Sequence, residues 1–321
     1  MLEAALEHGA VSAAAGSLAD ALDGAEAAFV AAPVGALPGA VRAVLAAAGP
    51  ECVVTDVGST KRAIAAAAED PRFIGGHPLA GAETAGVAHA RAGLFEGAVW
   101  YLTPGPLTSG IHYERLHRLL VDLGARPAAI DPAAHDRLMA SVSHLPHVLA
   151  NVLVAQAARA LSADAERLPA TGPSFRDATR VAGASTAMWA DVYLANADAL
   201  VEAIDDTVRR LQDARSALAA GDRAAVAAWN DGAREDRRRL LEVDLAGGTV
   251  CELRVSVPNR PGVVARVALA LAEAGVNIVD MALAPAPDMS SGTISLWVAG
   301  PERAAQAEAL VAGLGFPVAR P

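Results

Sequence analysis

Histidine, arginine and serine side chains occur in four short stretches of the chain, and the first three of these contain glycine or proline. These stretches are 56–61 (DVGSTK), 75–83 (GGHPLAGAE), 143–147 (SHLPH) and 175–180 (FRDATR). An imidazole can act as a general base near neutral pH, and a guanidinium can bind a carboxylate through two parallel donors. Glycines beside such groups are typical of strand ends that present polar side chains from tight turns. We therefore expect an active site centred on the run 56–104.

His77 follows two glycines and precedes a proline. Gly75 and Gly76 allow close approach of another backbone, and Pro78 restricts the exit of the chain, so the imidazole would be held in one place. A general base requires such a fixed position. The alternative is a loop histidine without a role, and the local sequence alone does not decide between the two.

His144 and His147 are three residues apart, so they project from one helical face. They could be polar residues at the start of a Pro-kinked helix, substrate contacts, or a zinc pair, although no third metal ligand is evident nearby. Asp177 and Arg180 are also three apart and could form either a solvated ion pair or a carboxylate clamp. The segment 58–61 lacks the leading glycine of a P-loop, so a nucleoside-triphosphate site is discounted.

The elements that position these residues alternate between strand and helix in the first part of the chain. Strands are expected near 27–33, 51–57, 72–74, 99–102 and 126–130, with helices between them. This alternation predicts a parallel sheet with helices on both faces, a Rossmann-like α/β domain over 1–131. Ligands bind such sheets at the carboxyl ends of the strands. Ser59, His77 and Thr103 each follow an expected strand and could share that edge.

Helices replace strands from Pro132 onward, which predicts an all-α domain over 132–246. One long helix is expected over 189–220, and its apolar residues from Leu194 to Leu218 recur every three or four positions. Such a seam requires another helix, in the same subunit or in a symmetry mate, so we expect a homodimer. After a linker at Gly247-Gly248, the order β-α-β-β-α-β predicts a ferredoxin-like domain over 249–321.

The bulk composition excludes several classes of protein. Apolar residues make up 53% of the chain and charged residues 19%, and the net charge is −10. The acidic balance argues against nucleic-acid and anionic-membrane partners, which need a basic field. The N-terminus does not resemble a signal peptide, and no charge-free apolar run reaches the length of about 20 residues that a membrane helix needs. We expect a cytoplasmic protein in which Cys52 and Cys251 are buried thiols rather than a disulfide.

Taken together, the four stretches, followed by Met188-Trp189, resemble the prephenate dehydrogenase (arogenate dehydrogenase) family of tyrosine biosynthesis. The tail resembles an ACT domain through 259–262 (NRPG) and 275–278 (GVNI). The resemblance implies NAD(P)-dependent oxidation of a cyclohexadienol with loss of carbon dioxide. It implies prephenate as the substrate and an amino acid such as tyrosine as the effector. The resemblance does not decide between prephenate and arogenate as the substrate, or between NAD and NADP as the cofactor.

The resemblance also assigns roles to individual residues. His77 would accept the proton of the ring hydroxyl, and Ser59 would orient that hydroxyl and His77. Arg180 would clamp a substrate carboxylate, with His147 preferred over His144 as a substrate contact. The other implied site residues are Glu83 and Asp177 as support, His144 and Trp189 near the substrate, Pro33, Asp56 and Ser59 at the cofactor, and Asn259, Gly262 and Asn277 at the effector site. No metal is implied.

One feature of the family pattern is not found in the sequence. A Gly-x-Gly-x-x-Gly turn after a first strand should hold the pyrophosphate of the cofactor. By the usual length of a βαβ unit, about 30 to 40 residues of the dinucleotide fold are expected to be missing. The expectation is that the start codon is misassigned or the chain truncated, and that this chain binds NAD poorly.

Two other classes of function compete with the dehydrogenase. The chain could be an amino-acid-sensing regulatory protein that is no longer catalytic, or a β-hydroxyacid dehydrogenase. The latter enzymes rely on a helix-borne lysine, and Lys61 is the only lysine here.

Overall fold

The computed structural model describes residues 2–81, 86–161, 171–243, 250–258, 260, 263–276, 278–286 and 290–320. Glu83, Asn259, Gly262, Asn277 and the expected Gly247-Gly248 linker lie outside the described residues. The chain forms two compact units, Met1–Arg209 and Arg210–Pro321. The three domain ranges expected from the sequence stay a prediction.

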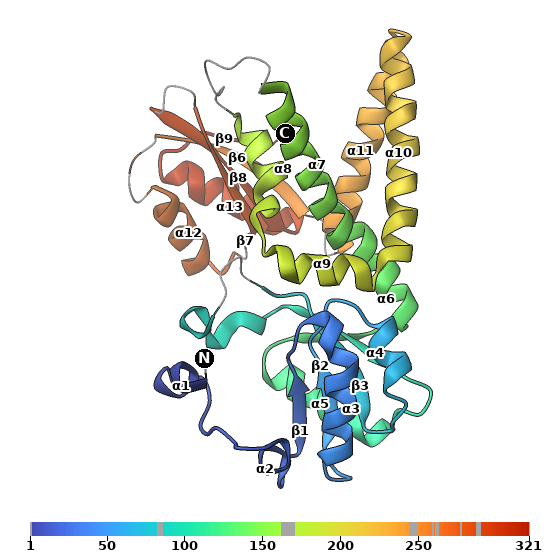
Figure 1. The fold of residues 1–321 in the computed structure, drawn as a ribbon. Coiled ribbons are helices and arrows are strands. Elements are labelled where there is room, and N and C mark those ends of the chain that lie inside the picture. Colours follow the sequence, from blue (N-terminus) through green and yellow to red (C-terminus); the bar gives the residue numbers. More distant parts are fainter. Residues whose placement is uncertain are drawn as a thin grey trace. The chain divides into compact units, whose positions relative to one another are not determined.

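The first unit contains a five-stranded sheet (Figure 1). Its strands, in spatial order, are β1 (Ala27–Val30), β2 (Val53–Asp56), β3 (Phe73–Pro78), β4 (Val99–Pro104) and β5 (Arg126–Ala129). The strands β1, β2 and β3 are parallel, β4 is antiparallel to β3, and β5 is parallel to β4. The expected α/β sheet is thus confirmed, but it is mixed rather than wholly parallel.

The reversal at β4 corrects the expected position of Thr103. This residue pairs with Gly75 near the beginning of β3, whereas His77 pairs with Tyr101 near the end of β3. Because β4 runs in the opposite direction, the carboxyl ends of β3 and β4 are at opposite edges of the sheet. Thr103 therefore does not share an edge with His77.

Helices cover both faces of this sheet (Figure 1). On one face, α3 (Leu37–Ala47) and α4 (Arg62–Ala67) bury Leu37, Val41 and Ile64 against residues of β1, β2 and β3. On the other face, α5 (Gly110–Asp122) buries Leu116 and Leu120 against Trp100 and Leu102. The remaining short elements of this part are α1 (Leu2–Glu7), α2 (Leu18–Leu22), and the 3-10 turns Val34–Ala36, Val87–His89 and Ala92–Phe95.

The strand β3 is longer than the expected 72–74, and it contains His77. It continues through Gly75 and Gly76 because neither residue has a side chain to collide with its neighbours. A Cβ on Gly76 would lie 2.5 Å from the carbonyl oxygen of Asp56, and a Cβ on Gly75 would overlap Thr103 Oγ1. His77 is therefore held by a strand rather than by a loop.

The helical part of the first unit begins with α6 (Pro132–Met139), a π-helical segment (Ala140–His144) and α7 (Leu145–Leu161). Asp131 caps α6, accepting hydrogen bonds from the backbone N–H groups of Ala133 and Ala134 at 3.0 and 2.9 Å. Pro146 has no N–H group, so the regular helical hydrogen-bond ladder cannot continue through the preceding turn, and a wider turn forms there.

Further along are α8 (Pro173–Thr179), the 3-10 turn Arg180–Gly183, α9 (Thr186–Ala195) and α10 (Ala197–Ala219). The expectation of one helix over 189–220 is wrong, because the helix breaks at Asn196, with φ −125° and ψ 30°. Asparagine favours helix ends because its side chain competes for hydrogen bonds.

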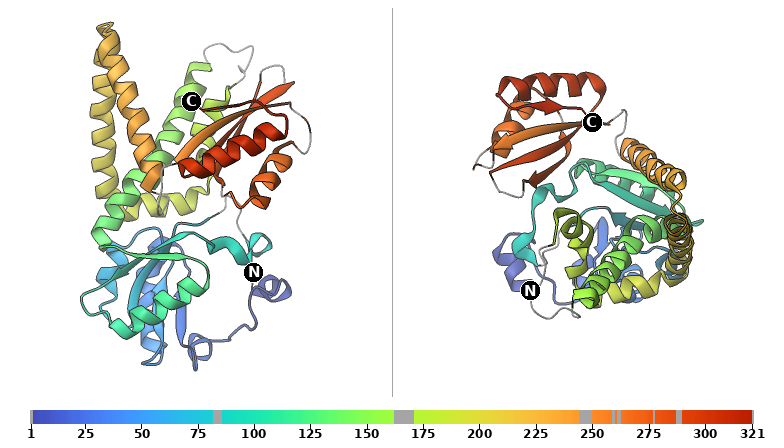
Figure 2. Two further views of the ribbon diagram at one scale, coloured as in Figure 1. Left: turned by 180° about the vertical axis from the view of Figure 1, so that it is seen from behind. Right: turned by 90° about the horizontal axis from the view of Figure 1, so that it is seen from above.

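The second unit contains the end of α10, α11 (Arg223–Val243) and an α+β module. Gly221, at φ +64°, lies between α10 and α11, which run antiparallel (Figure 2). The module consists of β6 (Val250–Pro258), α12 (Val263–Glu273), β7 (Ile278–Pro285), β8 (Ser291–Ala299), α13 (Pro301–Gly313) and β9 (Val318–Ala319). Its sheet has the order β7-β8-β6-β9 with antiparallel pairs, and α12 and α13 pack on one face over a core that includes Leu253, Val267 and Ile294. The expected ferredoxin-like arrangement is confirmed.

Candidate active site

A fully buried ion pair, Lys61 with Asp56, lies under the candidate site. Lys61 Nζ also donates to the carbonyl oxygen of Gly76 at 2.7 Å. Asp56 accepts from the backbone N–H groups of Gly58 and Gly76 at 2.9 and 3.1 Å. The turn after β2 is thereby fixed to the residue that precedes His77.

This burial changes the expected role of Asp56. Neither member of the pair has exposed surface, and both oxygens of Asp56 are already bonded. A direct contact between Asp56 and a cofactor is therefore not compatible with the structure. Burial lowers the pKa of Lys61, while the ion pair with Asp56 opposes that shift. A lysine so enclosed does not fit the role that a β-hydroxyacid dehydrogenase requires.

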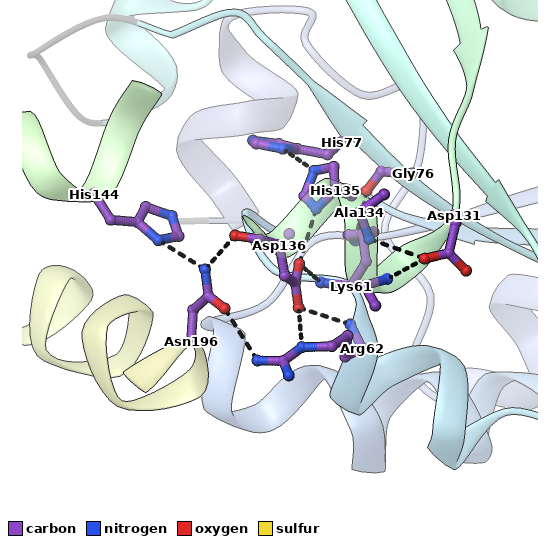
Figure 3. Close-up of polar contacts among 12 residues, drawn as sticks. Lys61, Arg62, Gly76, His77, Asp131, Ala134, His135, Asp136, His144 and Asn196 are labelled. Carbon is purple, nitrogen blue, oxygen red and sulfur yellow. Dashed lines mark hydrogen bonds and ion pairs between the residues drawn. The ribbon is translucent and has the colours of Figure 1, made fainter. Parts of the chain in front are cut away.

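His77 belongs to a chain of hydrogen-bonded side chains (Figure 3). Its Nδ1 atom lies 2.9 Å from Nε2 of His135, and the two rings meet edge to face. The Nδ1 atom of His135 lies 2.9 Å from Oδ1 of Asp136. His135 and Asp136 are fully buried, whereas His77 is partly exposed. The ring of His77 is thus held in place by a buried residue of α6.

Asp136 connects α6 to the first turn of α4 (Figure 3). It accepts hydrogen bonds from the backbone N–H groups of Lys61 and Arg62 at 2.7 and 3.0 Å, and from Nε of Arg62 at 3.3 Å. Burial raises the pKa of the Asp136 carboxyl, but the hydrogen bonds from His135, Arg62 and Lys61 outweigh it, so the net shift is downward. Asp136 is therefore a carboxylate in the folded protein.

Asn196, at the break between α9 and α10, extends this network to the second histidine motif. Its side-chain nitrogen lies 2.7 Å from the carbonyl oxygen of Asp136 and 3.2 Å from Nδ1 of His144. Its side-chain oxygen accepts from Arg62 at 3.2 Å. Within the described part of the chain, the buried Nε2 atom of His144 has no hydrogen-bond partner. His144 is therefore fixed through one nitrogen only.

Burial lowers the pKa of all three histidines assigned to this site. The pKa of His144 falls to about 4, with burial the largest cause. The pKa of His77 falls well below its ordinary value because of burial and then the nearby His135 and Lys61. Burial also lowers the pKa of His147. The rings are therefore neutral at physiological pH, and a neutral imidazole can accept a proton.

A cavity of about 310 Å³ lies between α7, α9 and the turn that begins at Arg180. The ring of His147 stacks on Trp189, with centroids 3.4 Å apart, and Tyr193 lies beside Trp189. The lining residues are His147, Asn151, Val181, Ala182, Ala184, Thr186, Trp189, Ala190 and Tyr193. Arg180 directly precedes two of them. An aromatic wall with a few polar groups suits a small cyclic ligand.

The structure brings some of the expected residues together and separates others. His77 and His144 share one network, and His144 contacts the Trp189 ring edge to face, with centroids 6.1 Å apart. Ser59 is partly exposed after β2, and in the described structure the hydrogen-bond partner of the His77 ring is His135 instead. Asp177 is exposed on α8. Glu83 lies outside the described residues, so its expected support of the site stays a prediction.

Four residues of the network were not found by sequence reasoning: Arg62, His135, Asp136 and Asn196. Two signals could have indicated them. His135-Asp136 is an adjacent pair of titratable residues just inside an Asp-Pro helix start. Asn196 is a cap-favouring residue in the middle of an otherwise helical pattern.

Three of the expected site residues lie at the carboxyl edge of the parallel strands, where a dinucleotide binds sheets of this kind. Pro33 is exposed after β1, Ser59 is partly exposed after β2, and His77 follows at the end of β3. The cofactor contacts expected of Pro33 and Ser59 stay a prediction. Among the described residues, Gly75 and Gly76 face packed neighbours instead of an open cradle, so they do not fit a pyrophosphate. The geometry defines an α/β protein whose sheet, with polar residues at its carboxyl edge, is joined to a helical region.

Comparisons with known proteins specify the family. The prephenate dehydrogenase nucleotide-binding domain matches residues 1–128, its dimerization domain matches 131–230, and the ACT domain matches 252–305. Cyclohexadienyl dehydrogenase of Zymomonas mobilis is 31% identical over 63% of this chain and 71% of that protein. The chain belongs to the prephenate dehydrogenase family.

Two further relatives extend the comparison. Prephenate dehydrogenase of Bacillus subtilis is 34% identical over 72% of this chain, and the match spans 64% of the length of that relative, less than two thirds. Prephenate dehydrogenase of Aquifex aeolicus, solved with hydroxyphenyl propionate and NAD⁺, has a TM-score of 0.67 and 25% identity, covering 74% of this chain and 85% of that one.

Proposed function

We propose that this protein is an NAD-dependent prephenate dehydrogenase, which converts prephenate to 4-hydroxyphenylpyruvate and carbon dioxide. The observation that carries the proposal is the placement of His77. Its ring is fixed by a hydrogen bond to a buried partner, it lies at the carboxyl end of β3, and burial keeps it neutral. A positioned, neutral imidazole is what proton abstraction from a substrate hydroxyl requires.

In the proposed reaction the substrate O–H bond breaks and its proton passes to His77. The C–H electron pair of the same ring carbon leaves as hydride, and the C–O bond becomes a carbonyl. The carboxylate on the opposite ring carbon then leaves as carbon dioxide. The electron pair of the broken C–C bond makes the ring aromatic, and the former carbonyl oxygen becomes a phenolate that takes up a proton. NAD, when bound, supplies the hydride acceptor. Aromatisation favours the second step, so the chain's residues need only bind, orient and remove one proton.

The helical cavity supplies the substrate contacts in this proposal. The stacked His147 and Trp189 would meet the ring of the substrate, and Arg180, at the entrance of the turn that lines the cavity, would bind a carboxylate. Ser59 would orient the substrate hydroxyl. Asp177 would stay near the rim of the site.

The test is NADH formation from prephenate and NAD by the full chain. Turnover by the wild type, its loss in His77→Asn, and retained prephenate binding by that variant support the proposal. Parallel assays with arogenate and with NADP decide the substrate and cofactor. Tyrosine binding without turnover of either substrate would contradict the proposal and favour an amino-acid-sensing protein.

We also propose that the protein is a homodimer through its helices. Val201 and Leu211 on α10 are 54% and 59% exposed, and Leu194 is 78% exposed. The continuous run Pro132–Arg159 is long and apolar enough to cross a membrane by length and composition, with 28% of its most apolar window buried. The match to a dimerization domain over 131–230 supports a second subunit as the cover of these apolar faces.

The ferredoxin-like module is proposed to bind an amino-acid effector such as tyrosine. The support is the ACT match over residues 252–305. Asn259, Gly262 and Asn277 are the proposed contacts. An increase in melting temperature with tyrosine, absent in an Asn277→Ala variant, would support this role, and no shift in the wild type would contradict it.

A further inference from the structure

His135 lies between the proposed base and a buried carboxylate (Figure 3). One of its ring nitrogens is 2.9 Å from His77 and the other is 2.9 Å from Asp136. His135 has no exposed surface, so water does not compete for either nitrogen. The three side chains form a line of two hydrogen bonds that ends at His77.

The carboxylate at the far end determines the direction of both hydrogen bonds. An ionised carboxylate only accepts hydrogen bonds, so Nδ1 of His135 carries a proton. With this one ring proton, His135 accepts through Nε2, and Nδ1 of His77 is the donor. The lone pair of neutral His77 is therefore on its Nε2 atom. A neutral histidine free in water favours the opposite tautomer, with the proton on Nε2.

The position of Asp136 is itself fixed by other donors. Oδ1 also accepts from the backbone N–H of Lys61, and Oδ2 accepts from two nitrogens of Arg62. With both oxygens occupied in this way, the carboxylate cannot rotate away from His135 without losing hydrogen bonds inside the protein. The direction of the two hydrogen bonds from His77 through His135 to Asp136 is thus determined by backbone geometry at the start of α4.

We propose that His135, oriented by Asp136, is a positioning residue that keeps His77 in the tautomer whose Nε2 atom can take the substrate proton. This rests on the proposed function, because it specifies the base of that reaction. When Nε2 of His77 takes the hydroxyl proton, the new imidazolium still donates through Nδ1 to His135. The charge is then stabilised by Asp136 through the intervening ring, as a carboxylate supports an imidazolium in a catalytic triad.

The first experiment reads the tautomer directly and does not depend on activity. Long-range proton–nitrogen NMR spectra of the full chain, labelled with ¹⁵N-histidine, distinguish the two neutral tautomers, and His77→Asn assigns the signal. The expected result is a proton on Nδ1 of His77 in the wild type and a change toward Nε2 in His135→Leu. A proton on Nε2 of His77 in the wild type would overturn the proposal.

The second experiment measures turnover of prephenate in His135→Leu and His135→Gln. The glutamine amide offers an acceptor and a donor at about the spacing of the two ring nitrogens, so it can bridge His77 and Asp136. We expect kcat to fall roughly 10²-fold in the leucine variant, the low end of a general-base contribution, with KM for prephenate little changed. The glutamine variant should recover most of that loss, and the pH profile of kcat should move only in the leucine variant.

His112 provides the matched control, because it is a partly buried histidine on α5 outside this network. His112→Leu and His112→Gln should leave the His77 signal and kcat unchanged. Equal loss of kcat in the two His135 variants, with an unchanged His77 tautomer, would show a merely structural role and overturn the proposal. If the wild type does not turn over prephenate, the proposed function fails while the tautomer result still decides the role of His135.

Discussion

The side-chain nitrogen of Asn196 lies 2.7 Å from the carbonyl oxygen of Asp136. The same side chain contacts His144 and Arg62, so the break between α9 and α10 ties together α4, α6 and the π-helical segment. The residue at the helix break therefore also helps to fix the positions of the site histidines.

Replacing Asn196 should test that connection. Asn196→Leu keeps a similar volume but removes the partner of the buried His144 Nδ1 atom. The Asp136 carbonyl and Arg62 each lose one hydrogen bond and keep others. A buried group left unpaired costs about 1 to 3 kcal/mol, so we expect the free energy of unfolding to fall by about that amount. Urea denaturation measures this. Asn151→Leu, at an exposed position on α7, should change stability by no more than about 0.5 kcal/mol. Equal midpoints for the two variants would contradict the role of Asn196.

Removing Lys61 should be more costly than removing any surface charge. Lys61→Met leaves Asp56 as an unpaired buried carboxylate, and breaking a buried pair in this way costs about 3 to 5 kcal/mol. The double variant Asp56→Asn with Lys61→Met should recover part of that loss. Arg118→Ala removes an exposed i,i+4 pair with Glu114 and should cost about 0.5 kcal/mol or less. A Lys61→Met protein as stable as the Arg118→Ala protein would show that the pair does not support the site.

Gly76→Ala should disrupt β3 through backbone contact alone. The added Cβ would lie 2.5 Å from the Asp56 carbonyl oxygen and 2.7 Å from Thr55 Oγ1, so β2 and β3 would have to separate. We expect a loss of about 2 kcal/mol or more, in the range of overpacked cores, together with displacement of His77. Gly39→Ala is the control, because a Cβ there meets nothing within 4 Å and α3 should gain up to about 1 kcal/mol. Thermal or urea unfolding of the pair should give changes of opposite sign.

The alternation of strands and helices could be predicted from periodicity. The spacing of apolar residues within each segment shows which of its residues are buried, and this spacing differs between strands and helices. The direction of β4 could not be predicted, because an antiparallel step depends on how a connection crosses the sheet. His77 was found because the glycines and proline beside it are local signals. His135 was missed because its significance depends on Asp136, Lys61 and His77 meeting across 58 to 75 positions of sequence. Asn196 was missed for a similar reason: an apolar helical pattern on both sides concealed the break.

The stability of the protein should fall as the pH drops from about 6.5 toward 4. Burial lowers the pKa of His144 from an ordinary value of 6.5 to about 4, so the folded ring stays neutral while the unfolded ring takes up a proton. The stabilisation is fully present above pH 6.5 and is lost as the pH approaches the folded value; it amounts to about 2 kcal/mol between pH 7 and pH 5. His77, whose pKa is also lowered, adds in the same direction.

His144→Gln should reduce this dependence on pH, because glutamine does not titrate. The free energy of unfolding in urea, measured at pH 7 and pH 5, gives the difference for each protein. His89→Gln changes an exposed histidine and should keep the wild-type dependence. If His144→Gln loses as much stability between the two pH values as the wild type does, the His144 ring is not the group that takes up the proton.

The apolar face of α10 should determine the oligomeric state. Leu211 is 59% exposed in the single chain, which is unusual for one of a series of apolar residues on the same helix, and a second subunit would cover it. We expect the mass from light scattering to correspond to two chains for the wild type, and to one chain for the Leu211→Glu variant at the same concentration. Ile111→Glu is the control, because Ile111 is 70% exposed on α5, outside the helical segment that matches the dimerization domain. A charge at Ile111 should therefore leave the dimer intact, and a wild-type protein that is monomeric at every concentration would show that α10 does not form the interface.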